Sequence, residues 1–168
     1  MQRRFCLVML ASGAALDLAG CGFELRKAPN FSFKTLFSPL AETSPVGVEL
    51  KRSLESTGKV RVITDVRDMA QAEVVLEVLS ERREKVVTSR NAAGQVREFQ
   101  LRIGFKFRLR GAKGKDLIDD TEIVQQRDIS FNESAVLAKE AEEALLYREM
   151  QSDIVQQIMR RLAAVQQL

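Results

Sequence analysis

The stretch F-Q-L-R-I-G-F-K-F-R-L, residues 99–109, carries apolar side chains at six successive odd positions. These residues are Phe99, Leu101, Ile103, Phe105, Phe107 and Leu109. Polar residues and one glycine occupy the positions between them, so the hydropathy alternates with a period of two residues. This period over eleven residues predicts a β-strand with one buried face and one face in water.

A second β-type segment, residues 73–89, precedes this strand, and the tetrapeptide 91–94 (Asn-Ala-Ala-Gly) supplies a turn between the two. A symmetric hairpin would oppose three pairs of residues: Leu76 with Leu109, Glu77 with Arg108, and Val78 with Phe107. Apolar side chains then meet apolar ones and opposite charges meet, which favours this register.

Closer to the turn the same register fails. It places the charged side chain of Arg82 opposite Ile103. Likewise, Glu84 would lie opposite Leu101. A β-bulge would repair the mismatch by moving the later side chains to the other face. Without a bulge the outer hairpin projects past the core of the domain, and we then expect another protein to cover it.

Shorter patterns predict the elements before the hairpin. Residues 31–37 predict a first strand with its alternate residues on one side: Phe31, Phe33, Thr35 and Phe37. Ser44 is the expected N-cap of a short helix with Pro45 at its first position. The apolar stripe of that helix comprises Val46, Leu50 and Leu54, and Gly58 is expected to end it. Residues 60–63 fit either a brief strand or an extended link.

After the hairpin, residues 111–115 predict a second turn and residues 122–131 a third long strand. A long helix is expected to follow, with Ser134 or Asn132 as its N-cap. Its predicted apolar stripe comprises Leu137, Ala141, Leu145, Met150, Ile154, Ile158, Leu162 and Val165. The element order predicts an α+β fold. We expect a two-layer sandwich whose mixed, mostly antiparallel four-stranded sheet carries two helices on one face.

The first twenty residues have the features of a secretory signal. Arg3 and Arg4 precede an apolar region, residues 5–16, that is too short to span a bilayer. The segment ends in Leu18-Ala19-Gly20-Cys21, a pattern typical of bacterial lipoproteins, in which the cysteine is acylated. A plain signal peptide with a chance cysteine is the alternative. We therefore expect a cleaved signal peptide (1–20), a lipidated lead (21–30) and a single domain (31–168).

Composition excludes several function classes. Removing the signal leaves 24 of the 26 basic and 22 of the 23 acidic residues, a balance too even to suggest nucleic acid as a partner. There is no histidine, and Cys21 would be acylated, so histidine triads, His/Cys zinc sites and free-thiol nucleophiles are absent. Gly-rich phosphate loops are also missing. We expect no catalytic residue, no metal and no cofactor.

Four basic residues share the polar face of the predicted central strand: Arg102, Lys106, Arg108 and Arg110. Two interpretations compete for this basic row. Cross-strand ion pairs with Glu77 and Glu81 would make it structural, whereas free cations would suit phosphate groups. We favour the ion pairs.

Two segments at opposite ends of the chain resemble one known family. Residues 21–26 (Cys-Gly-Phe-Glu-Leu-Arg) look like the C-G-F-x-L-R start of LptE, the lipopolysaccharide-assembly lipoproteins. The segment from Leu137-Ala138-Lys139-Glu140 through Tyr147-Arg148-Glu149-Met150 to Arg160-Arg161-Leu162 resembles the long C-terminal helix of the same family. The expected element order also agrees over the whole mature chain.

The resemblance implies a lipoprotein on the periplasmic face of the outer membrane, and Gly22 after the cysteine favours that membrane. Family members plug the lumen of the LptD β-barrel and help to insert lipopolysaccharide, which they are reported to bind. By location, the resemblance carries ligand contacts over to Arg90 in the hairpin turn and Lys139 at the helix start. Arg97 is a weaker candidate. Cationic side chains suit lipid A phosphates, although Arg90 and Lys139 are equally compatible with solvated surface residues.

A second hypothesis is an auxiliary periplasmic lipoprotein of a lipid or solute transporter. Purification in mild detergent separates the two, since a β-barrel would accompany the first and an inner-membrane complex the second. A third hypothesis, an envelope hydrolase, is disfavoured by the missing catalytic side chains.

Overall fold

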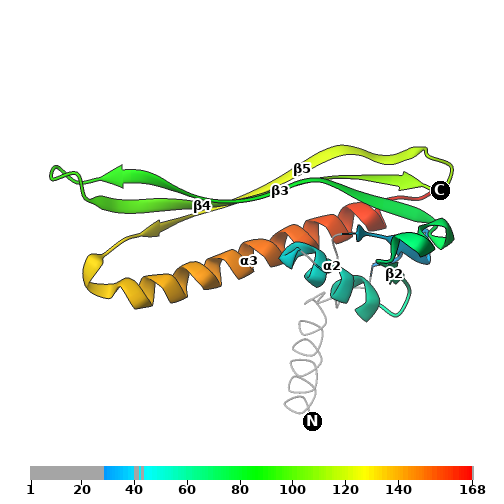
Figure 1. Cartoon of the computed structure of the whole chain (residues 1–168), viewed down its shortest axis with the longest axis horizontal. Helices are drawn as coiled ribbons and strands as arrows, with labels where there is room; N and C mark the ends of the chain where they lie inside the picture. The colour runs from blue at the N-terminus through cyan, green and yellow to red at the C-terminus, as the bar shows by residue number, and fades with distance from the viewer. Residues whose placement is uncertain (1–28, 40–41, 43, 168) are drawn as a thin grey trace, which may run out of the picture.

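Three long antiparallel strands form the body of the molecule (Figure 1). The structure is a computed structural model that describes residues 29–39, 42 and 44–167. The strands are β3 (Val74–Arg90), β4 (Val96–Gly111) and β5 (Asp116–Ser130). The first two confirm the predicted hairpin, and β5 begins at Asp116 rather than at residue 122. The predicted signal peptide and Cys21 lie outside the described residues.

Two short strands extend the sheet, β1 (Thr35–Phe37) and β2 (Arg61–Ile63). Both run parallel to their neighbours in the order β2-β1-β3-β4-β5. The predicted count of four strands is wrong, because residues 61–63, whose state the sequence left open, pair with β1. The sheet is mixed, as expected, with parallel pairing confined to its short end.

A β-bulge at Leu79 resolves the conflict in the predicted register. Up to Val78 the pairs are those expected, including Leu76 with Leu109 and Val78 with Phe107. Ser80 then pairs with Lys106, so the residues of β3 from Ser80 to Val87 are displaced by one position relative to β4. Because of this shift, Arg83 lies opposite Ile103 and Lys85 opposite Leu101. The charged residues of distal β3 are thereby divided differently between the two faces of the sheet.

The short helix α2 (Pro45–Ser56) forms as its capping sequence predicts. Ser44 Oγ accepts a hydrogen bond from Gly47 N at 2.9 Å, and Pro45 occupies the first helical position. Gly58 follows the helix with a φ of +67°, a conformation that glycine adopts without strain. A 3₁₀ segment, η3 (Val66–Gln71), connects β2 to β3.

The long helix α3 (Val136–Ala163) follows a short 3₁₀ turn, η4 (Glu133–Ala135). Asn132 caps this turn by accepting from Ser134 N at 3.0 Å. The prediction that Asn132 or Ser134 caps the long helix is therefore wrong. Ala135 precedes α3 and makes no side-chain capping bond.

One main core joins the two helices to the inner face of the sheet, which confirms the two-layer arrangement. Helix α2 contributes Val46, Leu50 and Leu54, and the inner face of β4 contributes the odd-numbered residues from Leu101 to Leu109. Both helices lie on the same side of the long strands in Figure 1. None of the helices in the described ranges is long and apolar enough to cross a membrane.

The predicted apolar stripe of α3 is confirmed only in the C-terminal half of the helix. Met150, Ile154 and Ile158 are fully buried, whereas Leu137 is 82% exposed and Leu145 49% exposed. A stripe written at four-residue intervals drifts away from the 3.6-residue helical period. Leu146, rather than Leu145, consequently packs against the core.

The first strand also differs from its prediction. Phe33 and Leu36 lie in the main core, but Phe37 joins Ile63 and Ala72 in a second, smaller cluster. Only residues 35–37 are extended as a strand, so the alternation expected from residue 31 does not hold.

Candidate functional site

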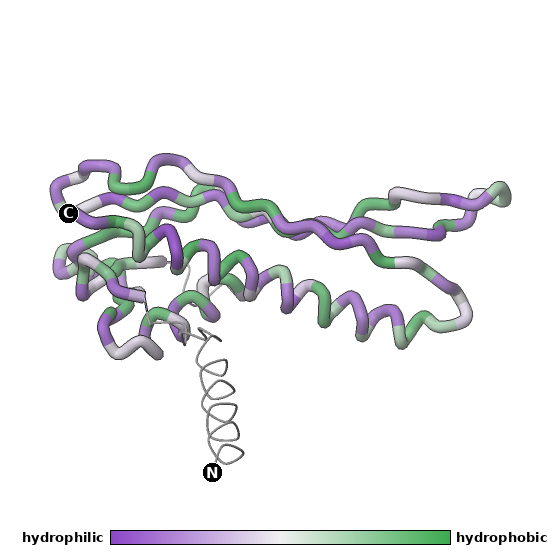
Figure 2. The backbone as a smooth tube through the Cα atoms, turned by 180° about the vertical axis from the view of Figure 1, so that it is seen from behind, coloured by the Kyte–Doolittle hydropathy of each residue, from purple (hydrophilic) through white to green (hydrophobic). Residues whose placement is uncertain are grey.

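The end of the sheet that carries the β3–β4 turn brings the predicted ligand residues into one region. The tip of the β3–β4 hairpin extends beyond the start of α3 (Figures 1 and 2). There β5 ends at Ser130, and the chain turns through η4 into α3. We refer to this region, residues 85–99 and 129–143, as the distal end.

Arg90 lies at the base of the hairpin turn. Asn91 organises the turn, since its Oδ1 accepts hydrogen bonds from Ala93 N at 3.0 Å and Gln95 N at 2.9 Å. Gly94 has a φ of +81°, which the turn requires. The exposed Arg90 guanidinium donates from Nη1 to Gly94 O at 3.1 Å. The remaining donors of this guanidinium are available to a ligand.

Lys139 lies in the first turns of α3 and points back toward the end of β5. Its Nζ donates to Ser130 Oγ at 3.0 Å and pairs with Glu142 Oε2 at 2.8 Å. Its side chain is 22% exposed. Lys139 is therefore anchored between the helix and the sheet, and its charge is partly neutralised.

Arg97 lies beside the point where β5 ends. Its carbonyl oxygen accepts a hydrogen bond from Phe131 N at 2.7 Å. Its side chain is exposed and has no hydrogen bond or ion pair with the other described residues. Arg97 and Lys139 thus adjoin consecutive residues, Phe131 and Ser130, while Arg90 lies farther out in the turn.

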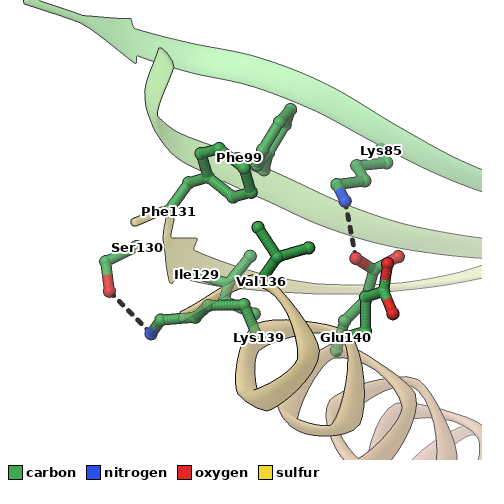
Figure 3. Close-up of a pocket in the computed structure, with 9 residues that line it drawn as sticks. Lys85, Phe99, Ile129, Ser130, Phe131, Val136, Lys139 and Glu140 are labelled. Carbon is green, nitrogen blue, oxygen red and sulfur yellow. Dashed lines mark hydrogen bonds and ion pairs between the residues drawn. The ribbon is translucent and has the colours of Figure 1, made fainter. Parts of the chain in front are cut away.

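A pocket of about 70 Å³ opens at the distal end, between α3 and the strands (Figure 3). Its apolar lining consists of Phe99, Ile129, Phe131 and Val136, and its charged lining of Lys85, Lys139, Glu140 and Glu143. The rings of Phe99 and Phe131 meet edge to face with centroids 5.5 Å apart. Apolar surface and two ammonium groups therefore share one small site.

Lys85 was not among the predicted site residues. The register expected without a bulge places it opposite Gln100 on the outer face of the sheet. The bulge at Leu79 instead places it opposite Leu101, on the face that α3 covers. A mismatch between apolar and charged positions near the turn was the only signal in the sequence. It indicated a bulge without locating it.

The basic row on the outer face is largely neutralised by neighbouring strands. Glu77 pairs with Arg108 at 2.6 Å and with Arg110 at 3.0 Å. The hydrogen bond that Arg108 donates to Glu77 raises the pKa of the Arg108 guanidinium above its ordinary value. Carboxylates of β5 complete the network: Asp120 with Lys106 at 3.1 Å and Asp116 with Arg110 at 3.1 Å.

The network agrees with the ion-pair interpretation of the basic row, with two corrections. Glu81 pairs with Phe105 in the ladder and so does not face the row, because the bulge moves it to the other side. Arg102 has no carboxylate partner in the described part of the chain, and its Nε donates to Gln100 Oε1 at 2.6 Å. Within the described ranges, no three His, Cys, Asp or Glu residues gather closely enough to hold a metal ion.

Comparisons with known proteins identify a family for this chain. Residues 33–162 match the family described as "LptE: Lipopolysaccharide-assembly". The LPS-assembly lipoprotein LptE of Yersinia pestis (strain Pestoides F) is 28% identical over 167 residues, which are 98% of this chain and 78% of the relative.

Solved structures of bacterial lipoproteins share the fold. Lipoprotein B of Nitrosomonas europaea superposes with a TM-score of 0.71 at 32% identity, covering 85% of this chain and 91% of the other. The rare lipoprotein B of Shewanella oneidensis has a TM-score of 0.61 at 23% identity, covering 78% and 95%. The family match spans the core elements from Phe33 to Leu162, and the chain belongs to the LptE family of lipopolysaccharide-assembly lipoproteins.

Proposed function

We propose that this LptE-family protein is an outer-membrane lipoprotein anchored through acyl chains on Cys21, after removal of residues 1–20. It serves as the plug and assembly partner of an LptD-type β-barrel and binds lipopolysaccharide during its insertion. The role is non-enzymatic, needs no cofactor and does not involve nucleic acid. The observation that carries the proposal is the family match over residues 33–162.

The outer face of the sheet supports a place inside a polar lumen. Acidic and basic side chains from three adjacent strands are paired across this face, from Arg82–Glu122 to Arg110–Asp116. The interiors of large outer-membrane barrels are polar, so a slender domain with a hydrophilic, internally paired face suits that environment. Such a face needs no apolar partner to cover it.

Affinity purification of the full-length protein in mild detergent tests the partnership. We expect one large β-barrel protein to co-purify in equal amount. Co-purification of an ABC-type inner-membrane complex instead would support the transporter-auxiliary role.

Charge reversal at the distal end tests lipopolysaccharide binding. We expect the double variant Arg90→Asp, Lys139→Asp to lose most binding in a pull-down, because the cations suited to lipid A phosphates become anions. The matched control reverses Lys113 and Lys115, which lie in the turn at the opposite end of the sheet. Unchanged binding by the double variant would remove both residues from the site.

Hydrogen exchange tests whether the barrel covers the distal hairpin. Residues 81–88 are all exposed in the isolated chain, although residues 81–87 pair with β4. We expect slower exchange across residues 84–99 when the partner is bound. Equal protection with and without the partner would leave this hairpin outside the interface.

A further inference from the structure

One of the two lysines that line the distal pocket, Lys85, is not a residue that the family resemblance indicates. Lys85 reaches it from β3, whereas Lys139 reaches it from α3, and Figure 3 shows their two side chains on different sides of the pocket. The Lys85 ammonium lies 4.3 Å from the centroid of the Phe99 ring. Its side chain is 37% exposed, so the charge is accessible from solvent.

Apolar surface lies directly between the two ammonium groups. Ile129, Val136 and the Phe99–Phe131 pair line the pocket, and Leu137, which follows Val136 in the sequence, is 82% exposed. Cations next to an exposed apolar surface match an amphiphile that joins an anionic group to hydrocarbon. A free inorganic phosphate would leave the apolar lining in contact with water.

We infer that Lys85 is a further anion-binding residue of the lipopolysaccharide site, acting with Lys139 on a phosphate of lipid A at the mouth of the pocket. This inference rests on the proposed function. A cavity of about 70 Å³ has room for only a few water-sized groups, so the glucosamine units stay outside. The apolar lining then contacts the first methylene groups of an acyl chain.

In the unliganded protein, both lysines are held by carboxylates of α3. Glu143 pairs with Lys85 at 2.6 Å, and Glu142 pairs with Lys139 at 2.8 Å. Glu140 lines the pocket beside Glu143, so the lining itself carries two carboxylates. A phosphate therefore competes with a carboxylate for each ammonium, and these ion pairs weaken binding. Neutralising Glu143 should consequently increase affinity, which a purely structural role of the Lys85–Glu143 pair does not predict.

The experiment measures binding of bisphosphorylated lipid A to the purified full-length lipoprotein in detergent micelles. We expect Lys85→Glu to weaken binding roughly tenfold, the scale of one lost charged hydrogen bond. Lys85→Arg should retain binding, and Glu143→Gln should strengthen it about threefold. The matched controls are Lys113→Glu in the β4–β5 turn and Glu149→Gln, exposed on α3, and neither should change affinity. Thermal unfolding of each variant checks the fold.

The outcomes separate the inference from the proposed function. If the wild-type protein binds lipid A and Lys139→Glu weakens binding while Lys85→Glu does not, the role of Lys85 is overturned and the proposed function stands. If Glu143→Gln weakens binding as much as Lys85→Glu does, the ion pair is structural and the inference also fails. Absence of wild-type binding removes the proposed lipopolysaccharide site itself.

Two further probes identify the source of the phosphate. Monophosphorylated lipid A should bind more weakly and lose most of the dependence on Lys85. Phosphatidylglycerol vesicles offer the same anionic chemistry without the disaccharide. Equal dependence on Lys85 with these vesicles would overturn lipid A as the specific ligand.

Discussion

Single residues connect the part of β3 next to the distal end to the helix beneath it. Tyr147 is buried, and its hydroxyl donates to Glu84 O at 2.7 Å. The Arg83 guanidinium carbon lies 3.6 Å from the centroid of the same ring. One tyrosine thus holds the part of β3 that follows the bulge, and with it the position of Lys85.

The variant Tyr147→Phe should lower the free energy of unfolding by about 1 kcal/mol, because the ring remains and one buried hydrogen bond is lost. Chemical denaturation measures this change. An unaltered free energy of unfolding would mean that solvent replaces the tyrosine hydroxyl at Glu84 O. The phenylalanine ring should still stack with Arg83.

Gly104 lies under the Arg82–Glu122 ion pair, which spans the central strand. A Cβ there would lie 3.5 Å from Glu122 Oε1 and 3.6 Å from Arg82 Nε, both ordinary contacts. Gly104→Ala should therefore stabilise the fold by about 0.5 kcal/mol, since alanine restricts the unfolded chain. The control Gly94→Ala should destabilise it, because Gly94 has a φ of +81°. A loss of stability in Gly104→Ala, measured by thermal unfolding, would contradict the prediction.

At the scale of elements, β3 changes character along its length. Its first residues contribute Val74 and Leu76 to the core, while the distal part presents charged side chains to both faces. The bulge at Leu79 separates these two parts. Helix α3 shows the complementary change, since its C-terminal half is buried and its first turns are partly exposed. The candidate site therefore lies where both elements leave the core.

Two substitutions along α3 test this division. Ile154→Ala should cost about 2–5 kcal/mol, because Ile154 is fully buried and the change leaves a cavity. Leu137→Ala should change stability by less than about 0.5 kcal/mol, because Leu137 is 82% exposed. Thermal unfolding of the two variants compares them. Similar costs would show that the first turn of α3 packs as tightly as its centre.

At the scale of the whole molecule, the proposed anchor and the proposed ligand site belong to different parts of the chain. The core unites α2, α3 and the long strands, and the cationic site lies at one end of this body. Cys21 precedes all of the described elements in the sequence. Anchoring and ligand binding should therefore be separable by mutation.

The variant Cys21→Ala should fold normally and lose membrane retention, because the proposed anchor consists of the acyl chains on this cysteine. Membrane fractionation and thermal unfolding check the two parts of the prediction. Cys6→Ala is the matched control, since Cys6 lies within the expected signal and should leave lipidation intact. Full membrane retention of Cys21→Ala without the barrel partner would contradict the anchor.

The sequence by itself determined the features that depend on local patterns. Alternation over residues 99–109 predicted β4 and its buried face, and Ser44-Pro45 predicted the start of α2. The two end segments that resemble LptE indicated the family, and through it predicted Arg90 and Lys139 as ligand contacts, which stays a prediction. Each of these features depends on neighbouring residues along one chain segment, so one segment is enough to predict it.

Tertiary structure alone decided the features that depend on two segments at once. The position of the bulge reflects the pairing of β3 with β4 together with the packing of α3 below them. The stripe of α3 likewise follows the helical period counted from its buried half. Lys85 joins the pocket for this reason: a one-residue shift in pairing moves a side chain to the opposite face of a sheet, and register is a property of both strands.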